Sequence, residues 1–225
     1  MKLQLRSLAL VSLLCLPFRP ILAAEANHNF ARWEKEIAAY ERNDATNPPP
    51  KEASVFIGSS TIARWKTLGN DFAGVPVVNR GFGGSEIVDS THFAPRLIFP
   101  HAPRQVFLRA GGNDLWAGKS VSQVFADFKE FAETVHRQLP RTEIIYISLS
   151  PSVARWKQHE QEKQLNTLVA NYLAGKTWLK YLETYDLPLG SDGQPRKELF
   201  VKDGLHFNAD GYKLLAEKVR PLLAR

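Results

Sequence analysis

The stretch "VFIGSSTIARW", residues 55–65, decides the fold, because an apolar run breaks there at Gly58 and continues as a helical pattern. Three consecutive apolar residues before the glycine are typical of a strand buried on both faces, as in a parallel sheet. Ser59 and Ser60 stand where the strand gives way to the helix. Backbone N–H groups without partners gather at such a turn, so a serine there is either a helix cap or a nucleophile.

Similar apolar runs alternate with helical patterns along the rest of the chain. Strands are predicted at 54–57, 75–79, 105–109 and 143–150, with a weaker candidate at 178–185. Apolar residues spaced three and four apart predict helices at 30–44, 60–68, 85–99, 120–139, 157–175 and 208–225. Such an alternation predicts the α/β class: a three-layer α/β/α sandwich around a parallel sheet of about five strands.

Composition and charge narrow the possible functions. A chain of 225 residues with 44% hydrophobic and 23% charged residues is expected to form one globular domain with one substantial core. The formal net charge is +6, but three basic residues lie within residues 1–24, so the remainder carries only +3. Because no run of Lys and Arg is present, no nucleic-acid partner is expected.

The first 24 residues have the three parts of a secretory signal peptide. Lys2 and Arg6 precede an apolar run over 8–18, and small residues follow up to a cleavage site after Ala24 or Ala26. A retained membrane anchor is the alternative, but the run is short for a membrane span. We therefore expect an exported protein, periplasmic or secreted, with a mature domain over 25–225 and no stable membrane association.

The predicted signal peptide also contains the single cysteine of the chain, Cys15. The mature chain would then have neither a disulfide nor a thiol, which excludes cysteine nucleophiles and cysteine-based metal sites.

Loops that follow the strands carry the chemistry-bearing residues. Sites in open parallel sheets form beyond the carboxyl ends of the strands, where these loops converge. The loop sequences are "GSS" (58–60), "NRGFGGS" (79–85), "AGGNDLWAG" (110–118), "SPSVARW" (150–156) and, before the last helix, "DGLHF" (203–207). Three of them are rich in glycine, and two of these also carry a residue suited to acyl transfer.

These loops supply the parts of a serine hydrolase. Ser60 or Ser59 is the candidate nucleophile, and His206 with Asp203, three residues before it, is the candidate base and its orienting acid. Gly84 and Asn113 are candidate donors to a developing oxyanion. Each part alone has a common structural explanation, such as a cap or a surface turn, and only their combination points to catalysis.

The four blocks resemble the SGNH, or GDSL-like, hydrolase superfamily over most of the chain, from about Ser54 to the end. Gly58-Ser59-Ser60 matches the first block, Asn79 through Gly84 the second, Gly111 through Asp114 the third, and Asp203 with His206 the last. The resemblance implies a flavodoxin-like sandwich with Ser60, Asp203 and His206 as the catalytic residues. Ser59 replaces the aspartate that gives the motif its name, a position that is not catalytic in the family.

That resemblance also implies a reaction. Ser60 would form an acyl-enzyme, and the N–H groups of Ser60 and Gly84 with the Asn113 amide would hold the oxyanion, without a metal or organic cofactor. We expect a serine esterase that cleaves small O-acyl esters, in which the acyl group is an acetyl or another short chain. The alternatives are a lysophospholipase or thioesterase, an O-acyl transferase, and a non-catalytic carbohydrate- or lipid-binding module on the same fold.

Substrate contacts are predicted from residues near the four blocks. Trp65, Trp116, Arg155 and Trp156 are candidates to rim the pocket and to bind a carbohydrate or other small ester, although ordinary packing would explain the tryptophans equally well. Asp114 is expected to brace the loop of Asn113. Residues 186–200 form either one wall of the cleft or a plain surface loop, and the oligomeric state stays open.

Overall fold

The computed structural model describes residues 28–224, and the predicted signal peptide lies outside them. Five strands are present: β1 (Ser54–Gly58), β2 (Val77–Gly81), β3 (Gln105–Arg109), β4 (Glu143–Ile147) and β5 (Leu179–Leu182). The α-helices are α1 (Glu34–Thr46), α2 (Ser60–Ala63), α3 (Leu68–Asp71), α4 (Ile87–Leu97), α5 (Gly112–Trp116), α6 (Val121–Gln138), α7 (His159–Tyr172) and α8 (Ala209–Val219). Short 3₁₀ helices occupy Phe30–Trp33, Phe99–His101, Trp156–Gln158, Lys197–Leu199 and Arg220–Leu222.

The strands form one sheet in the order β2-β1-β3-β4-β5, and every neighbouring pair is parallel. This is the flavodoxin-like order, in which the chain first moves toward one edge from β1 and then returns to add strands on the other side. All five strands therefore end at the same edge of the sheet. The crevice at that edge, outside β1 and β3, is where the fold places a ligand.

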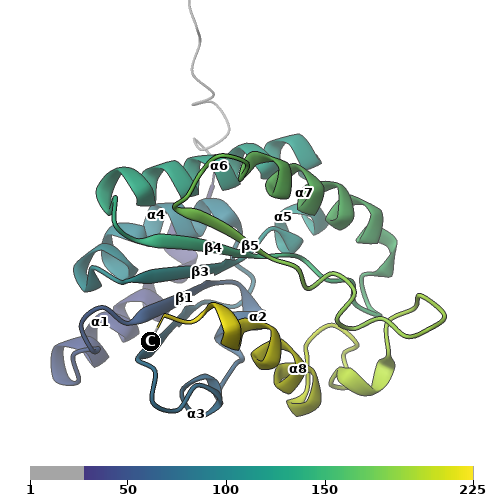
Figure 1. Cartoon of the computed structure of the whole chain (residues 1–225), viewed down its shortest axis with the longest axis horizontal. Helices are drawn as coiled ribbons and strands as arrows, with labels where there is room; N and C mark the ends of the chain where they lie inside the picture. Colours follow the sequence, from purple (N-terminus) through teal and green to yellow (C-terminus); the bar gives the residue numbers. More distant parts are fainter. Residues whose placement is uncertain (1–27, 225) are drawn as a thin grey trace, which may run out of the picture.

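Each face of the sheet is covered by its own hydrophobic core. Side chains alternate along a strand, so Val55 and Ile57 point to one face and Phe56 to the other. The first core continues into α1, α4, α6 and α7, and the second continues into α2, α8 and the segment around α3. In Figure 1, α4, α6 and α7 lie on one side of the strands while α3 and α8 lie on the other. The predicted three-layer α/β/α sandwich is confirmed.

The structure differs locally from the predicted elements. The helix predicted over 60–68 is interrupted after Ala63, because the Ile62 carbonyl accepts from the Trp65 N–H and from Asn79 Nδ2 (2.7 Å) instead of continuing the helix. The expected strand at 75–79 is β2, shifted by two residues at each end. β4 ends at Ile147, so residues 148–150 leave the sheet and become part of its carboxyl edge.

Within residues 28–224, no helix combines the length and the apolar character that a membrane crossing requires.

Candidate active site

The turn after β1 is built around a glycine that no other residue could replace without strain. Gly58 has φ +135°, and a Cβ at this position would lie 2.1 Å from the carbonyl oxygen of Arg109 on β3. The next N–H, of Ser59, donates to the same carbonyl at 3.1 Å. The chain then turns sharply into α2, whose first residue is Ser60. Ser60 thus stands at the carboxyl edge of the sheet.

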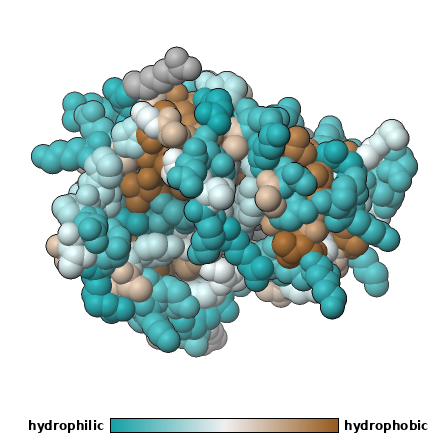
Figure 2. Space-filling model, turned by 90° about the horizontal axis from the view of Figure 1, so that it is seen from below, coloured by the Kyte–Doolittle hydropathy of each residue, from teal (hydrophilic) through white to brown (hydrophobic). Residues whose placement is uncertain are grey.

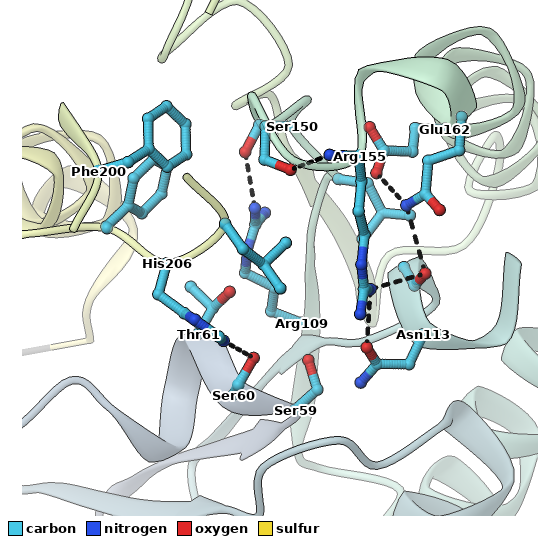
Figure 3. A pocket seen from close by; sticks show the side chains of 16 residues that line it. Ser59, Ser60, Thr61, Arg109, Asn113, Ser150, Arg155, Glu162, Phe200 and His206 are labelled. Carbon is cyan, nitrogen blue, oxygen red and sulfur yellow. Dashed lines mark hydrogen bonds between the residues drawn. The ribbon is translucent and has the colours of Figure 1, made fainter. Parts of the chain in front are cut away.

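Ser60, His206 and Asp203 form a continuous hydrogen-bonded chain. Ser60 Oγ lies 2.9 Å from His206 Nε2, and His206 Nδ1 lies 2.7 Å from Asp203 Oδ2. Figure 3 shows Ser60 and His206 side by side at the mouth of a pocket. Partial burial pushes the pKa of Asp203 upward, but hydrogen bonds from His206 outweigh it and hold the pKa well below its usual range. The carboxylate therefore stays ionised and can stabilise an imidazolium.

Local backbone geometry brings His206 to this place. Asp203 Oδ1 accepts from the N–H groups of Leu205 (2.9 Å) and His206 (3.0 Å), which folds the four residues into a tight turn. Two residues later, the side chain of Asn208 caps the first N–H groups of α8. A second contact from α8, Tyr212 Oη to the Thr61 carbonyl at 2.9 Å, ties this helix to the nucleophile helix.

Asn113 lines the opposite side of the pocket, whereas Gly84 is not among the residues that line it. A Cβ at Gly83 would lie 3.9 Å from Ser60 Cβ, so the glycine loop that carries Gly84 passes beside the nucleophile. Gly84 has φ +84°, a conformation that favours glycine. The Asn113 amide nitrogen donates to the Ser85 carbonyl at 2.9 Å, which joins the two loops.

Asp114 is buried and holds the loop of Asn113 against the start of α4, as expected. Its Oδ1 accepts from the Ile87 N–H at 3.1 Å, so it fixes the start of α4 just after the glycine loop. Burial raises the pKa of Asp114 to about 7. This buried carboxyl therefore holds backbone rather than substrate.

The pocket between these two sides is small and mostly polar. It is lined by Ser59, Ser60, Thr61, Arg109, Gly112, Asn113, Leu149, Ser150, Ser152, Arg155, Gln158, Glu162, Phe200, Leu205, His206 and Phe207. Arg109 reaches its floor from the end of β3 and donates to Ser150 Oγ at 2.6 Å. In Figure 3, His206 lies on one side of Ser60, and Arg109 and Arg155 lie on the other. A nucleophile, a base and several donors thus converge on one cavity, which is the arrangement that acyl transfer needs.

A family model identifies the family of the chain. Residues 56–214 match the GDSL-like Lipase/Acylhydrolase family, which is more than half of the 225 residues. The chain belongs to this family. It is accordingly a carboxylic ester hydrolase, and the predicted superfamily is confirmed. None of the curated proteins matches the chain.

Solved structures show the same acylhydrolase fold. A Streptococcus pneumonia protein provisionally described as a platelet activating factor superposes with a TM-score of 0.77 and 21% identity, covering 87% of this chain and 94% of its own. A GDSL-like lipase from Bacteroides thetaiotaomicron gives 0.66 and 19%, covering 86% and 96%. Axe2, an acetylxylan esterase from Geobacillus stearothermophilus, gives 0.60 and 14%, covering 75% and 93%.

Three of the predicted substrate contacts lie elsewhere in this acylhydrolase. Trp65 is only 1% exposed, because its ring packs in the second core against Phe56 and Phe72, so a pocket contact is wrong for it. Trp116 is 57% exposed but does not line the pocket, and Arg155 lies over its ring at 5.0 Å. Trp156 stacks on His159 and lines a second cleft. Arg155 alone of the four reaches the pocket of Ser60.

The second cleft explains what residues 186–200 do. Trp156 and Val153 form one side of it, and a segment of the long loop, 190–198, forms the other. A bridge between Leu189 and Pro195 gives this loop a hairpin shape. Val153 also lies against Gly204, where a Cβ would meet it at 3.3 Å, so the cleft lies next to the turn that carries His206.

Several pocket residues gave no signal in the sequence of this acylhydrolase. Arg109, Gln158 and Glu162 are nearly buried polar residues at strand-end or helical positions, where periodicity alone indicates only packing. Gln158 Nε2 donates to Glu162 Oε1 at 2.7 Å, and burial raises the pKa of Glu162 to about 7. No group of three metal-ligating side chains occurs in the part of the chain that the structure describes.

Proposed function

We propose that this acylhydrolase is a serine esterase that cleaves small O-acyl esters through an acyl-enzyme on Ser60. The observation that carries the proposal is the unbroken chain from Ser60 Oγ through His206 to Asp203, with contacts of 2.9 and 2.7 Å. A binding module would need no such general base. The choice of Ser60 over Ser59 rests on the same contact, because His206 bonds to Ser60.

The reaction follows from the positions of these groups. Ser60 Oγ attacks the ester carbonyl carbon while its proton passes to His206 Nε2, and the carbonyl oxygen becomes an oxyanion. Donors for that oxyanion are the Asn113 amide and the backbone N–H groups of Ser60 and Gly84. The leaving alcohol takes the proton from His206. A water molecule then repeats the two steps on the acyl-enzyme, which releases the carboxylic acid and restores Ser60.

Pocket size favours a short acyl group. The volume of the pocket is about 60 Å³. A water molecule needs about 10–15 Å³ on the same measure, so the pocket holds roughly four to six water-sized groups. An acetyl or similar short acyl group fits, whereas a fatty acyl chain would need an apolar tunnel instead of Arg109, Ser150 and Gln158. The face seen in Figure 2 carries its apolar residues in separate small areas, which also argues against a lipid surface as substrate there.

Carbohydrate is the alcohol part that the neighbouring cleft supports. Indole rings stack on sugar faces, and Trp156 lines that cleft together with the polar residues Asp192, Gln194 and Arg196. The structural neighbour described as an acetylxylan esterase acts on such a substrate. We therefore place acetylated sugars first among the candidate substrates.

We also propose that this esterase is exported to the periplasm or secreted. Residues 1–24 carry the pattern of a signal peptide, and a periplasmic or secreted enzyme would meet acetylated polysaccharide outside the cell. Mass spectrometry of the mature protein, expressed with its own leader, should find the chain beginning after Ala24 or Ala26. An intact Met1 in the exported fraction would contradict this part of the proposal.

The esterase proposal is tested with p-nitrophenyl acetate, butyrate and octanoate. Activity should fall as the acyl chain lengthens, and Ser60→Ala should abolish it while Ser59→Ala retains most of it. Equal losses in both variants would overturn the choice of nucleophile. A folded parent that hydrolyses none of the three esters would overturn the general esterase function.

A further inference from the structure

The Asn113 side-chain amide is held at both of its ends. Its oxygen accepts from Arg155 Nη1 at 2.9 Å, and its nitrogen donates one hydrogen to the Ser85 carbonyl at 2.9 Å. An amide nitrogen carries two hydrogens, so one remains for a ligand. In Figure 3 the Asn113 oxygen faces Arg155 and the nitrogen faces the side of Ser60.

Arg155 is itself fixed by its surroundings. Its guanidinium lies over the ring of Trp116 at 5.0 Å, and Nη1 also approaches the Gly112 carbonyl at 3.4 Å. Its backbone N–H donates to Ser152 Oγ at 3.3 Å. Burial lowers the pKa of Arg155, yet a guanidinium stays charged in proteins. Among residues 28–224, no carboxylate forms an ion pair with it, so its charge is directed at carbonyl oxygens of the Asn113 segment.

We propose that Arg155 is a positioning residue that acts on the reaction through Asn113. With the amide oxygen bonded to a guanidinium, rotation of the amide by 180° would place N–H groups against Arg155 and two oxygens against each other at Ser85. Both ends then oppose the flip, and the oxyanion always meets the amide nitrogen. The charge-assisted bond also polarises the amide, which makes its N–H a better donor.

The peptide before Asn113 is held by a second contact from the same region. Gln158 Nε2 donates to the Gly112 carbonyl at 3.3 Å and, with its other hydrogen, to Glu162 Oε1 at 2.7 Å. Gln158 is 5% exposed and Glu162 is 4% exposed. The segment that leads from β4 into α7 thus fixes both the side chain and the backbone of the oxyanion donor. This role replaces direct substrate binding as the function of Arg155.

The test is a double-mutant cycle between Arg155 and Asn113, and it rests on the proposed esterase function for its first readout. We would measure kcat and KM with p-nitrophenyl acetate for Arg155→Met, Asn113→Ala and the double variant. Arg155→Met should lower kcat by about ten- to a hundredfold, less than the roughly 10²–10³-fold cost of removing the oxyanion donor itself, and leave KM within about twofold. In the Asn113→Ala background the same substitution should have no further effect.

Further variants separate positioning from folding. Arg155→Lys keeps one charged donor and should recover part of kcat. Arg137→Met, at an exposed arginine that contacts Thr134, is the matched control and should leave activity unchanged. If circular dichroism shows that Arg155→Met does not fold, the cycle is run with Arg155→Lys.

A second readout does not depend on the substrate. A fluorophosphonate probe phosphonylates an activated serine, with loss of fluoride, and its phosphoryl oxygen occupies the oxyanion position. The labelling rate of Ser60 should follow the same pattern as kcat across the cycle. Labelling without ester hydrolysis would defeat the esterase function alone, and a parent that is not labelled would defeat both. Independent, multiplying losses in the cycle, or a raised KM at unchanged kcat, would show that Arg155 contacts substrate and would overturn the positioning role.

Discussion

The two sides of the pocket beside Ser60 are held in place in different ways. On one side, the side chain of Asp203 is 41% exposed, and short-range backbone hydrogen bonds shape the turn of His206. On the other side, Gln158 and Glu162 are buried. Gln158 donates to the carbonyl of Gly112, 46 positions away in the sequence, and to Glu162, one helical turn further along. Substitutions on the exposed side should therefore change activity with little effect on stability. Those on the buried side should change both.

The largest effect is expected on the exposed side, from His206→Ala. This substitution removes the general base, and loss of one member of a serine triad typically costs about 10⁴-fold or more in kcat. The melting temperature should change little, because the turn is made by Asp203 and backbone N–H groups that remain. Ester hydrolysis and thermal melting measure the two quantities.

His136→Ala is the matched control for that variant. His136 stacks on Trp178 at the end of α6 and is absent from the pocket lining, so this variant should keep its activity. A His206→Ala protein that retains a tenth of the parent rate would show that another group serves as the base.

A smaller loss is expected on the buried side, from Asn113→Ala. Removal of one oxyanion donor costs about 10²–10³ in kcat, or roughly 2.7–4 kcal/mol. The protein should also melt at a lower temperature, because Arg155 and the Ser85 carbonyl both lose a partner. Kinetics with p-nitrophenyl acetate and a melting curve test both expectations.

Asn113→Asp sharpens the comparison. The carboxylate has the same shape and can pair with Arg155, but its second oxygen cannot donate to the Ser85 carbonyl, and its charge opposes an oxyanion. We expect an inactive protein that, like Asn113→Ala, melts at a lower temperature than the parent. If Asn113→Asp is active, the amide does not face the oxyanion.

Much of the exposed side could be predicted from the sequence, because its geometry is local. Asp203 and His206 are three residues apart on one turn, and Ser60 follows a strand whose apolar run is easy to recognise. The sheet was predictable for a similar reason: the strand predicted at 105–109 coincides with β3, and the one predicted at 143–150 contains β4, which ends three residues earlier.

The buried side could not be predicted, because its contacts join distant segments. Arg155 meets Asn113 across 42 positions, and neither periodicity nor spacing indicates such a pair. Tryptophans gave the clearest error. Trp65 lies only five residues after Ser60, but the break after α2 turns it into the core, where large aromatic surface is best buried.

The pH dependence of stability distinguishes the two sides further. Burial raises the pKa of Glu162 from 4.5 to about 7, so the folded protein binds this proton more tightly than the unfolded chain does. Between these values, the free energy of unfolding falls as pH rises, by up to about 3 kcal/mol at about 1.4 kcal/mol per unit. Glu162→Gln removes this loss. The free energy of unfolding of the variant, relative to that of the parent, should therefore be about 1–3 kcal/mol higher at pH 8 than at pH 5.

Urea unfolding at both pH values measures that difference, and Glu217→Gln is its control. Glu217 is exposed on α8 and forms no ion pair within residues 28–224, so its substitution should shift both curves equally. Asp114, whose pKa burial also raises to about 7, is present in every variant and cancels in the comparison. Parallel stability profiles for the parent and Glu162→Gln would contradict a proton held at Glu162.

The smallest effect is expected where the buried side meets solvent, from Trp116→Ala. A cation–π contact at an exposed site contributes about 0.5–1 kcal/mol, so loss of the ring under Arg155 should lower kcat only about two- to fivefold. Trp116→Phe should retain most of the rate, because a phenyl ring still supports the guanidinium. With acetylated xylooligosaccharides the same factor should appear, since the ring acts through Arg155 and Asn113 on every ester alike. A rise in KM for the oligosaccharide alone, with p-nitrophenyl acetate unaffected, would instead make Trp116 a sugar contact, and the exposed face of the indole would then be the reason for its position.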